Sequence, residues 1–191
     1  MIIARILLLI ALASAAAAAL AQAPAIEAPL PQLEIADRGE IILNNDEFSY
    51  RPWSTAQAPG KVHVVQYFGA TQSDSELFEP FTDALQEFVT PGTFHVTTII
   101  NLDAAMWGTT GFVVSEVKKN KRTFPESTIV LDEEGVGVDT WELGKKGAGL
   151  LIVDSLGVVR HFTKQAMTDE EVERFVAMVE GYAVGGTVEG G

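Results

Sequence analysis

The 191-residue sequence contains no cysteine. A chain without thiols forms no disulfide, no thiolate–zinc site and no iron–sulfur cluster, so thiol–disulfide oxidoreductase activity is excluded by composition alone. Positive charge is also scarce, with 13 Lys and Arg against 26 Asp and Glu. This balance disfavours nucleic acid as a partner, because affinity for DNA or RNA depends on cations that neutralise phosphates.

A long uncharged and mainly apolar run lies at the start of the chain, where Ile6 to Leu20 follows Arg5. Half of it is alanine, and it is shorter than the roughly 20 apolar residues that a membrane span needs. It ends in Ala19-Leu20-Ala21, the small-x-small pattern that signal peptidase cleaves. We predict a cleavable signal peptide over residues 1–21, with cleavage after Ala21 and no stable membrane insertion afterwards; a retained membrane anchor is the alternative.

The remaining chain is long enough for one domain with its own core. Residues 22–32 contain three prolines and are expected to form a Pro/Ala-rich spacer or an ordinary N-terminal tail. We place the domain at residues 33–183. Residues 184–191 are rich in glycine and are expected to form a flexible tail.

Hydrophobic periodicity predicts alternating strands and helices in this domain. Residues 33–35 and 40–43 are expected to form a β-hairpin, since Asp37 and Gly39 suit a tight turn between them. Predicted strands follow at 62–68, 94–100 and 127–131, with 136–143 extending or following the last, and a second hairpin at 150–153 and 158–162. Helices are predicted after a capping box at 73–76, over 111–122, and after a second capping box at 168–171.

This order predicts an α/β fold with a mixed central sheet flanked by helices and preceded by an N-terminal β-hairpin. Strands that alternate with helices require crossovers, and a closing hairpin followed by a helix is typical of a thioredoxin-like domain. Another three-layer α/β fold is the alternative that the pattern alone leaves open.

Short motifs along almost the whole domain, from Leu33 to Tyr182, are similar to the YtfJ family of bacterial periplasmic thioredoxin-like proteins. They are Asp37-Arg-Gly-Glu40, Phe48-Ser-Tyr50, Trp53, Gln57, Gly60-Lys-Val62, Thr97-Thr-Ile-Ile-Asn101 with Asp103, Phe112-Val113, Asn120-Lys121, Pro125, Asp132, Gly135, Asp139 and Trp141-Glu-Leu143. The resemblance implies a periplasmic thioredoxin-like protein with no established activity. Ala104 departs from the pattern, which has a second acidic residue there.

The resemblance also locates the place of the missing dithiol. Where exported thioredoxin-like proteins read Phe-x-Ala-Thr-x-Cys-x-x-Cys, this chain has Phe68-Gly-Ala-Thr-Gln-Ser-Asp-Ser-Glu76, so Ser73 and Glu76 replace the cysteines and Asp74 lies between them. The stretch that faces the dithiol corresponds to 146–149 and has no proline. A simple helix cap beside a flexible loop is one interpretation. The other is a remodelled pocket for a polar or anionic ligand, formed by Ser73, Asp74 and Glu76 with Gly147 and Ala148.

Trp107 is a further binding candidate, because it is expected in a loop after a strand, where an aromatic side chain can contact a ligand or partner. Trp53 and Trp141 are expected in the core. The basic run 118–122 is interpreted as a solvated helix end that complements the helix dipole.

No catalytic residue, cofactor site or metal site is predicted. His63, His95 and His161 lie far apart in the sequence and are expected to be exposed or satisfied sheet residues. The run 132–135 with Asp139 lacks the spacing of a calcium loop and is expected to be a solvated turn.

The sequence therefore favours a periplasmic, non-catalytic binding or accessory protein, whose partner is an unknown protein or small molecule. An enzyme with a relocated carboxylate or metal-dependent pocket is the alternative. A transcriptional regulator, as some members of the family are labelled, is disfavoured because an export signal and a net charge of −13 both argue against it.

Overall fold

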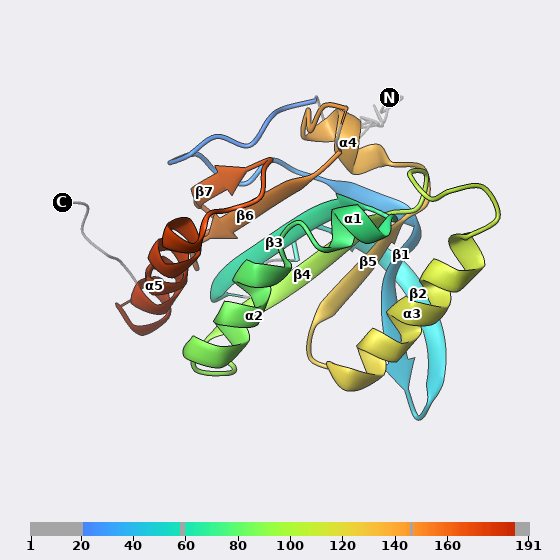
Figure 1. Cartoon of the computed structure of the whole chain (residues 1–191), viewed down its shortest axis with the longest axis horizontal. Coiled ribbons are helices and arrows are strands. Elements are labelled where there is room, and N and C mark those ends of the chain that lie inside the picture. The colour runs from blue at the N-terminus through green and yellow to red at the C-terminus, as the bar shows by residue number, and fades with distance from the viewer. Residues whose placement is uncertain (1–20, 58–59, 146, 186–191) are drawn as a thin grey trace, which may run out of the picture.

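The computed structural model describes residues 21–57, 60–145 and 147–185. Its centre is one sheet with the strand order β2-β1-β5-β4-β3-β6-β7 (Figure 1). The strands are β1 (Glu34–Asn44), β2 (Glu47–Ser54), β3 (Val62–Gly69), β4 (Phe94–Asn101), β5 (Thr128–Asp132), β6 (Gly149–Val153) and β7 (Val159–Thr163). β3, β4 and β5 run parallel, and the other neighbours pair antiparallel.

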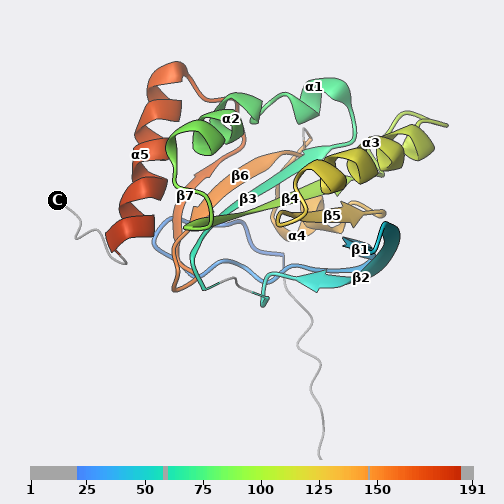
Figure 2. The same cartoon turned by 90° about the horizontal axis from the view of Figure 1, so that it is seen from below.

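The helices cover the two faces of this sheet unequally. They are α1 (Gln72–Ser75), α2 (Glu79–Phe88), α3 (Thr110–Thr123), α4 (Val136–Thr140) and α5 (Asp169–Gly185). Figure 2 shows α1, α2, α3 and α5 together on one face, with α4 and the segment before β1 on the other. The two crossovers β3–α2–β4 and β4–α3–β5 move in the same direction across the sheet, and right-handed connections therefore place both helices on the same side.

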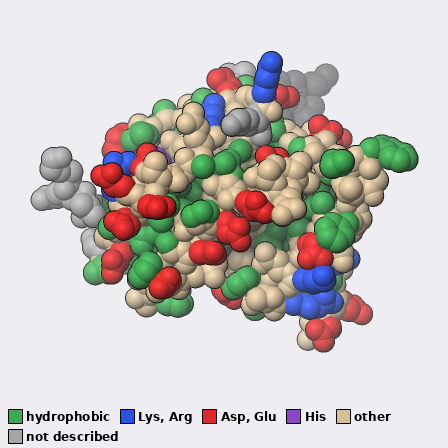
Figure 3. All heavy atoms as spheres, viewed as in Figure 1, with side chains coloured by type: hydrophobic (Ala, Val, Ile, Leu, Met, Phe, Trp, Pro, Cys, Tyr) green, Lys and Arg blue, Asp and Glu red, His purple; other side chains and the backbone are tan. Residues whose placement is uncertain are grey.

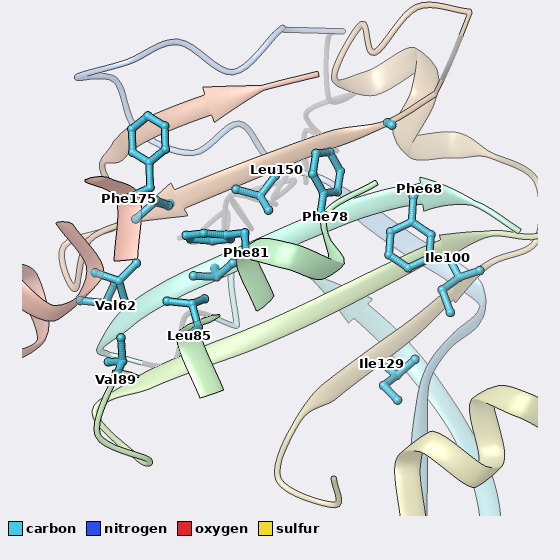
Figure 4. Close-up of a cluster of buried hydrophobic side chains, with 14 of the residues drawn as sticks. Val62, Phe68, Phe78, Phe81, Leu85, Val89, Ile100, Ile129, Leu150 and Phe175 are labelled. Atoms are coloured by element: carbon cyan, nitrogen blue, oxygen red, sulfur yellow. The ribbon is translucent and has the colours of Figure 1, made fainter. Parts of the chain in front are cut away.

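Each face has its own hydrophobic core, because alternate side chains of a strand point to opposite sides. Val62, Val64 and Phe68 of β3 face the large helices, where Phe78, Phe81 and Leu85 point down from α2 toward the sheet (Figure 4). Val65 and Tyr67 of the same strand face α4 and pack with Leu33, Ile35, Trp53, Trp141 and Leu143. The central strand is thus buried on both sides, as its continuous run of β-branched and aromatic residues predicts.

The N-terminal hairpin forms, but its predicted turn is wrong. The reversal lies at Asn45 and Asp46, which both have positive φ (48° and 68°), between β1 and β2. Both residue types tolerate the left-handed conformation that a two-residue hairpin turn requires. Asp37 to Gly39, the expected turn, lies instead at an irregularity inside β1, where the register shifts between Ile35 and Glu40.

Two other predicted elements need correction. The helix expected from a capping box at 73–76 is divided into α1 and α2, and Thr71 rather than Ser73 caps α1, since its hydroxyl accepts the backbone N–H of Asp74 at 3.2 Å. The strand expected around 136–143 is the short helix α4. The second capping box is confirmed, because Glu171 N–H donates to Thr168 Oγ1 and Thr168 N–H donates to Glu171 Oε2.

Residues 22–32 contact the domain along their length and do not form a free spacer. Gln22 N–H donates to Thr140 O at 2.8 Å, Glu27 N–H donates to Val159 O at 2.8 Å, and Pro29 forms a bridge with Val158. Trp141 Nε1 donates to Pro31 O at 3.3 Å. This N-terminal segment therefore closes the core on the α4 face.

Candidate functional site

The end of β3 leads directly into the predicted site. Thr71 begins α1, and its hydroxyl donates to Asp74 Oδ2 at 2.7 Å, so the Asp74 carboxylate is held against the end of the strand. A Cβ atom at Gly69 would lie 2.6 Å from Asp74 Oδ2 and 3.0 Å from Ala104 Cβ. The backbone at Gly69 therefore passes close to the Asp74 carboxylate, and a side chain at this position would have to displace it. Asp74 has a structural role here and does not face solvent freely.

Ser73 and Glu76 are both exposed, and both line a cavity of about 170 Å³, which we call the α1–α2 pocket. Its other lining residues are mostly apolar: Leu77, Phe78, Pro80, Phe81, Ala166, Met167 and Val172. They come from the link between α1 and α2, from α2 itself, from the loop after β7 and from the first turn of α5. Two residues at the positions of the missing dithiol thus lie beside a small apolar hollow.

The lining residues near α5, which are Ala166, Met167 and Val172, were not among the site residues predicted from the sequence. Met167 precedes the cap residue Thr168, and Val172 lies in the next turn of the helix, so the two occupy the positions of a hydrophobic staple. This staple accompanies the capping box that was predicted at 168–171. The local signal was therefore present, but it does not indicate that this end of α5 meets α1 and α2.

The other predicted site residues do not line the pocket. The Trp107 side chain is fully exposed in the loop between β4 and α3, next to the exposed Met106. Ala148 is buried in the core under the large helices, and Gly147 lies against Val138 of α4. The prediction that Ser73, Glu76, Gly147 and Ala148 form one pocket is therefore wrong. The loop 147–148 packs into the protein instead of facing a ligand.

A second set of polar groups lies near the carboxyl ends of β3 and β5. We call it the Asp132 cluster, and it consists of Asp132, Tyr67 and the backbone N–H groups of Val136 and Gly137. Asp132 is completely buried and accepts three hydrogen bonds, from Tyr67 Oη at 2.8 Å, Gly137 N at 2.9 Å and Val136 N at 3.0 Å. Burial is the main cause that raises the pKa of Tyr67, with the Asp132 charge adding to it, so the phenol stays protonated and donates. The cluster holds the first turn of α4 onto the sheet. The predicted solvated turn at 132–135 is therefore wrong at Asp132 and Gly135, which are buried, whereas Glu133 and Glu134 are exposed.

The three histidines lie in strands, as predicted. His63 and His95 lie side by side on β3 and β4, with ring centroids 5.3 Å apart and the rings tilted by 55°. Each Nε2 lies within hydrogen-bond distance of a threonine hydroxyl, that of Thr97 at 2.7 Å for His63 and that of Thr128 at 2.9 Å for His95. His161 differs, because its Nε2 is buried without a partner and its ring stacks on Phe175 at 3.6 Å. In the part of the chain that the structure describes, no three His, Asp or Glu side chains gather as metal ligands.

The basic run 118–122 is not uniformly solvated. Lys121 is buried, and its ammonium donates to the carbonyl oxygens of Pro125 and Ser127. Burial lowers the pKa of Lys121. Lys118 and Arg122 lie over the Phe48 ring at 5.3 and 4.6 Å from its centroid. These residues join α3 to the N-terminal hairpin, so the expected solvated helix end is in part a packing contact.

The fold is similar to that of known thioredoxin-like structures. The chain superposes on a thioredoxin-like superfamily protein, SPOA0173, with a TM-score of 0.57 and 14% sequence identity, covering 80% of this chain and 96% of that one. It also matches the thioredoxin domain of a thiol-disulfide oxidoreductase from Bacteroides vulgatus, with a TM-score of 0.52, 14% identity and coverage of 82% and 98%. The molecule has a thioredoxin-like fold and lacks cysteine.

Similarity in sequence identifies the family of the chain, which the fold alone does not. Residues 25–181 match the family described as "Bacterial protein of unknown function (YtfJ_HI0045)". "Uncharacterized protein YtfJ" of Escherichia coli (strain K12) is 33% identical over 152 residues, which cover 79% of this chain and 83% of the relative. An uncharacterized protein of Haemophilus influenzae is 29% identical over 157 residues, covering 82% and 85%. The chain belongs to the YtfJ family, as the sequence motifs predicted.

The predicted signal peptide, residues 1–21, lies outside the described residues except for Ala21, and most of the predicted tail 184–191 lies outside them as well. Within the described part of the chain, no helix is both long and apolar enough to cross a membrane.

Proposed function

We propose that this protein is an exported, periplasmic binding or accessory protein that acts without catalysis and holds its partner at the α1–α2 pocket. The signal peptide predicted from the sequence at residues 1–21 supports the location, and the pocket supports the binding role. The observation that carries the proposal is that the place of the dithiol is an open, mainly apolar hollow with Ser73 and Glu76 at its edge.

The surroundings of Ser73 support the absence of nucleophilic catalysis. A catalytic serine needs a base within hydrogen-bond distance of its hydroxyl. Among the described residues, Ser73 Oγ lies 3.2 Å from Thr71 Oγ1, and no histidine nitrogen bonds to it. A threonine hydroxyl does not accept a proton from serine near neutral pH, so Ser73 has the chemistry of a binding or capping residue.

The buried carboxylate Asp132 does not offer a relocated active site either. A general base must reach a substrate, but Asp132 has no exposed surface and already accepts three hydrogen bonds from the protein. Its geometry supports a role in holding α4.

The binding role is tested with the purified exported protein and its Ser73→Ala and Ala166→Trp variants. We expect no turnover of thiol, ester or phosphate substrates by any of the three. Robust turnover that disappears in Ser73→Ala would contradict a non-catalytic role. Crosslinking in the exported compartment, followed by identification of captured molecules, should recover a partner that Ala166→Trp no longer captures, because the indole fills the pocket.

Export is tested separately by the intact mass of the protein isolated from cells. We expect a chain that begins at Gln22 and is recovered from the periplasmic fraction. A chain that begins at Met1 in the cytoplasmic fraction would contradict export.

A further inference from the structure

The charges of this protein are distributed unevenly around the α1–α2 pocket. Between Val62 and Val117 the sequence has no Lys or Arg at all. The carboxylates in this stretch are Asp74, Glu76, Glu79, Asp83, Glu87, Asp103 and Glu116. In Figure 3, acidic and hydrophobic side chains mix over α1, α2 and α5, whereas the largest group of Lys and Arg lies over α3. The face that contains the pocket is therefore acidic and partly apolar.

Four exposed carboxylates stand next to residues that line the pocket. Glu76 lines it, Glu79 precedes the lining residue Pro80, and Asp169 and Glu170 lie between Met167 and Val172. None of the four takes part in an ion pair that the structure describes. Their negative charge is thus not neutralised by neighbouring side chains, and it favours a cationic partner.

The size of the pocket decides between a small molecule and a polypeptide. Sites that enclose metabolite-sized ligands measure about 300–1,000 Å³. The α1–α2 pocket measures about 170 Å³, which suits one large apolar side chain rather than a whole ligand. A polypeptide needs only such an anchor, because a single side chain in a central pocket contributes much of the binding energy of many protein interfaces.

We propose that the α1–α2 pocket binds a cationic polypeptide segment, with one large apolar side chain in the pocket and flanking Lys or Arg side chains paired with Glu76, Glu79, Asp169 and Glu170. The inference rests on the proposed function, because it names the partner of the same pocket. The apolar lining supplies the anchor, and the carboxylates select the charge of the segment.

Fluorescence anisotropy with labelled twelve-residue peptides tests the two requirements separately. The first peptide has a central Phe flanked by Lys and Arg, the second has Ala in place of Phe, and the third keeps Phe but has Glu in place of the cations. We expect the first peptide to bind at least ten-fold more tightly than either of the others. Its affinity should fall as salt is raised, since exposed charges are screened.

Variants of the protein test where the peptide binds. Ala166→Trp should weaken the Phe peptide at least ten-fold and change the Ala peptide little. Glu76→Gln with Glu79→Gln should weaken the Phe peptide about three- to ten-fold, because two of its ionic partners are lost. The matched control is Glu134→Gln with Asp139→Asn, which removes the same charge from exposed positions beside α4 and should change affinity less than two-fold.

The outcomes separate this inference from the proposed function. Equal affinity for the Phe and Ala peptides, or equal weakening by the two charge-neutralised variants, would show general attraction to an acidic protein and overturn the inference. If no cationic peptide binds but Ala166→Trp still abolishes capture of another molecule in cells, the inference fails and the proposed function stands. Unchanged circular dichroism and urea midpoints of each variant ensure that lost binding is not lost folding.

Discussion

The Asp132 cluster and the α1–α2 pocket lie on opposite faces of one sheet, and their polar groups differ in burial and in hydrogen bonding. Asp132 is fully buried, and each of its partners, Tyr67, Val136 and Gly137, is satisfied by it. At the pocket, Ser73 and Glu76 are exposed and no described ion pair includes Glu76. The first arrangement stabilises the fold, and the second keeps its polar groups at the surface, where they bond only to neighbouring side chains of the same short helix and its cap, Gln72 and Thr71.

Several residues of the family motifs belong to the buried region around α4. Asp132, Gly135 and Trp141 are among the motif residues that the chain shares with the family, and all three are buried around α4. Asn101 belongs to the same region, since a Cβ atom at Gly135 would lie 3.1 Å from its Oδ1. These motif residues therefore specify how the α4 face packs, and none of them lines the α1–α2 pocket.

The largest expected effect comes from Asp132→Ala. The substitution leaves the Tyr67 hydroxyl and two backbone N–H groups without their acceptor inside the protein, and each unsatisfied group costs about 1–3 kcal/mol. We expect the free energy of unfolding to fall by about 3–5 kcal/mol, measured by urea denaturation. The control Glu134→Gln changes a nearby exposed carboxylate that takes part in no ion pair that the structure describes, and it should cost less than about 0.5 kcal/mol. Similar values for both would show that the cluster does not anchor α4.

A smaller effect is expected from Gly137→Ala. The added Cβ would lie 2.2 Å from Tyr67 Cε2, so the ring or α4 must move. We expect a loss of about 2–3 kcal/mol in urea denaturation, as in other overpacked cores. Gly111→Ala is the matched control, because a Cβ there meets no atom within 4 Å and alanine favours helix α3. It should stabilise the protein by about 0.5–1 kcal/mol, and a loss of stability at both positions would contradict the steric explanation.

Two histidines, one on each face of the sheet, predict that the protein loses stability in acid. Burial lowers the pKa of His63 to about 3 and of His161 to about 4, below the value near 6.5 in the unfolded chain. The unfolded state therefore binds protons first, so stability is complete above pH 6.5 and falls as pH drops from 6.5 toward 4. The slope is at most about 1.4 kcal/mol per pH unit for each histidine.

Urea midpoints between pH 7 and pH 5 measure this slope, since most carboxylates titrate below that range. His161→Leu should reduce it, because leucine cannot bind the proton and leaves no buried Nε2 beside Phe175. An unchanged slope in His161→Leu would show that protonation of His161 does not affect stability.

The smallest effect is expected at the pocket. Ser73→Ala and Glu76→Gln change exposed side chains of the short helix α1, and we expect the free energy of unfolding to change by less than about 0.5 kcal/mol. Thermal denaturation measures both. A loss comparable to that of Asp132→Ala would mean that these residues hold the fold together and are not free for binding.

The strands and long helices could be predicted from the sequence because their signals are local. The apolar run of β3 and the spacing of Phe78, Phe81 and Leu85 each specify one element. The helix α4 could not be predicted, because Val136 and Val138 alternate with small residues in a strand-like pattern. Its first turn depends on hydrogen bonds to Asp132, whose own position depends on Tyr67, 65 residues away.

The candidate site was only half predictable for the same reason. Ser73 and Glu76 could be assigned to one site because their positions follow the dithiol pattern. Met167 and Val172 join them only through the packing of α5 against α2, which no local pattern shows. Gly147 and Ala148 were placed at the site by analogy with other thioredoxin-like chains, but in this protein they pack into the interior.

The N-terminal segment lies beside one edge of the sheet, where another copy of this protein could otherwise pair its own strand. β7 is the outer strand of the sheet, and an outer strand offers unpaired backbone groups to other chains. Residues 27–30 run beside its first residues (Figure 1), where Val159 exchanges backbone hydrogen bonds with Glu27 and Ala28. Pro29 and Pro31 have no N–H to pass the ladder on to a further strand. The segment thus covers the start of this edge, where the backbone groups of Val159 are no longer open to edge-to-edge pairing with another copy.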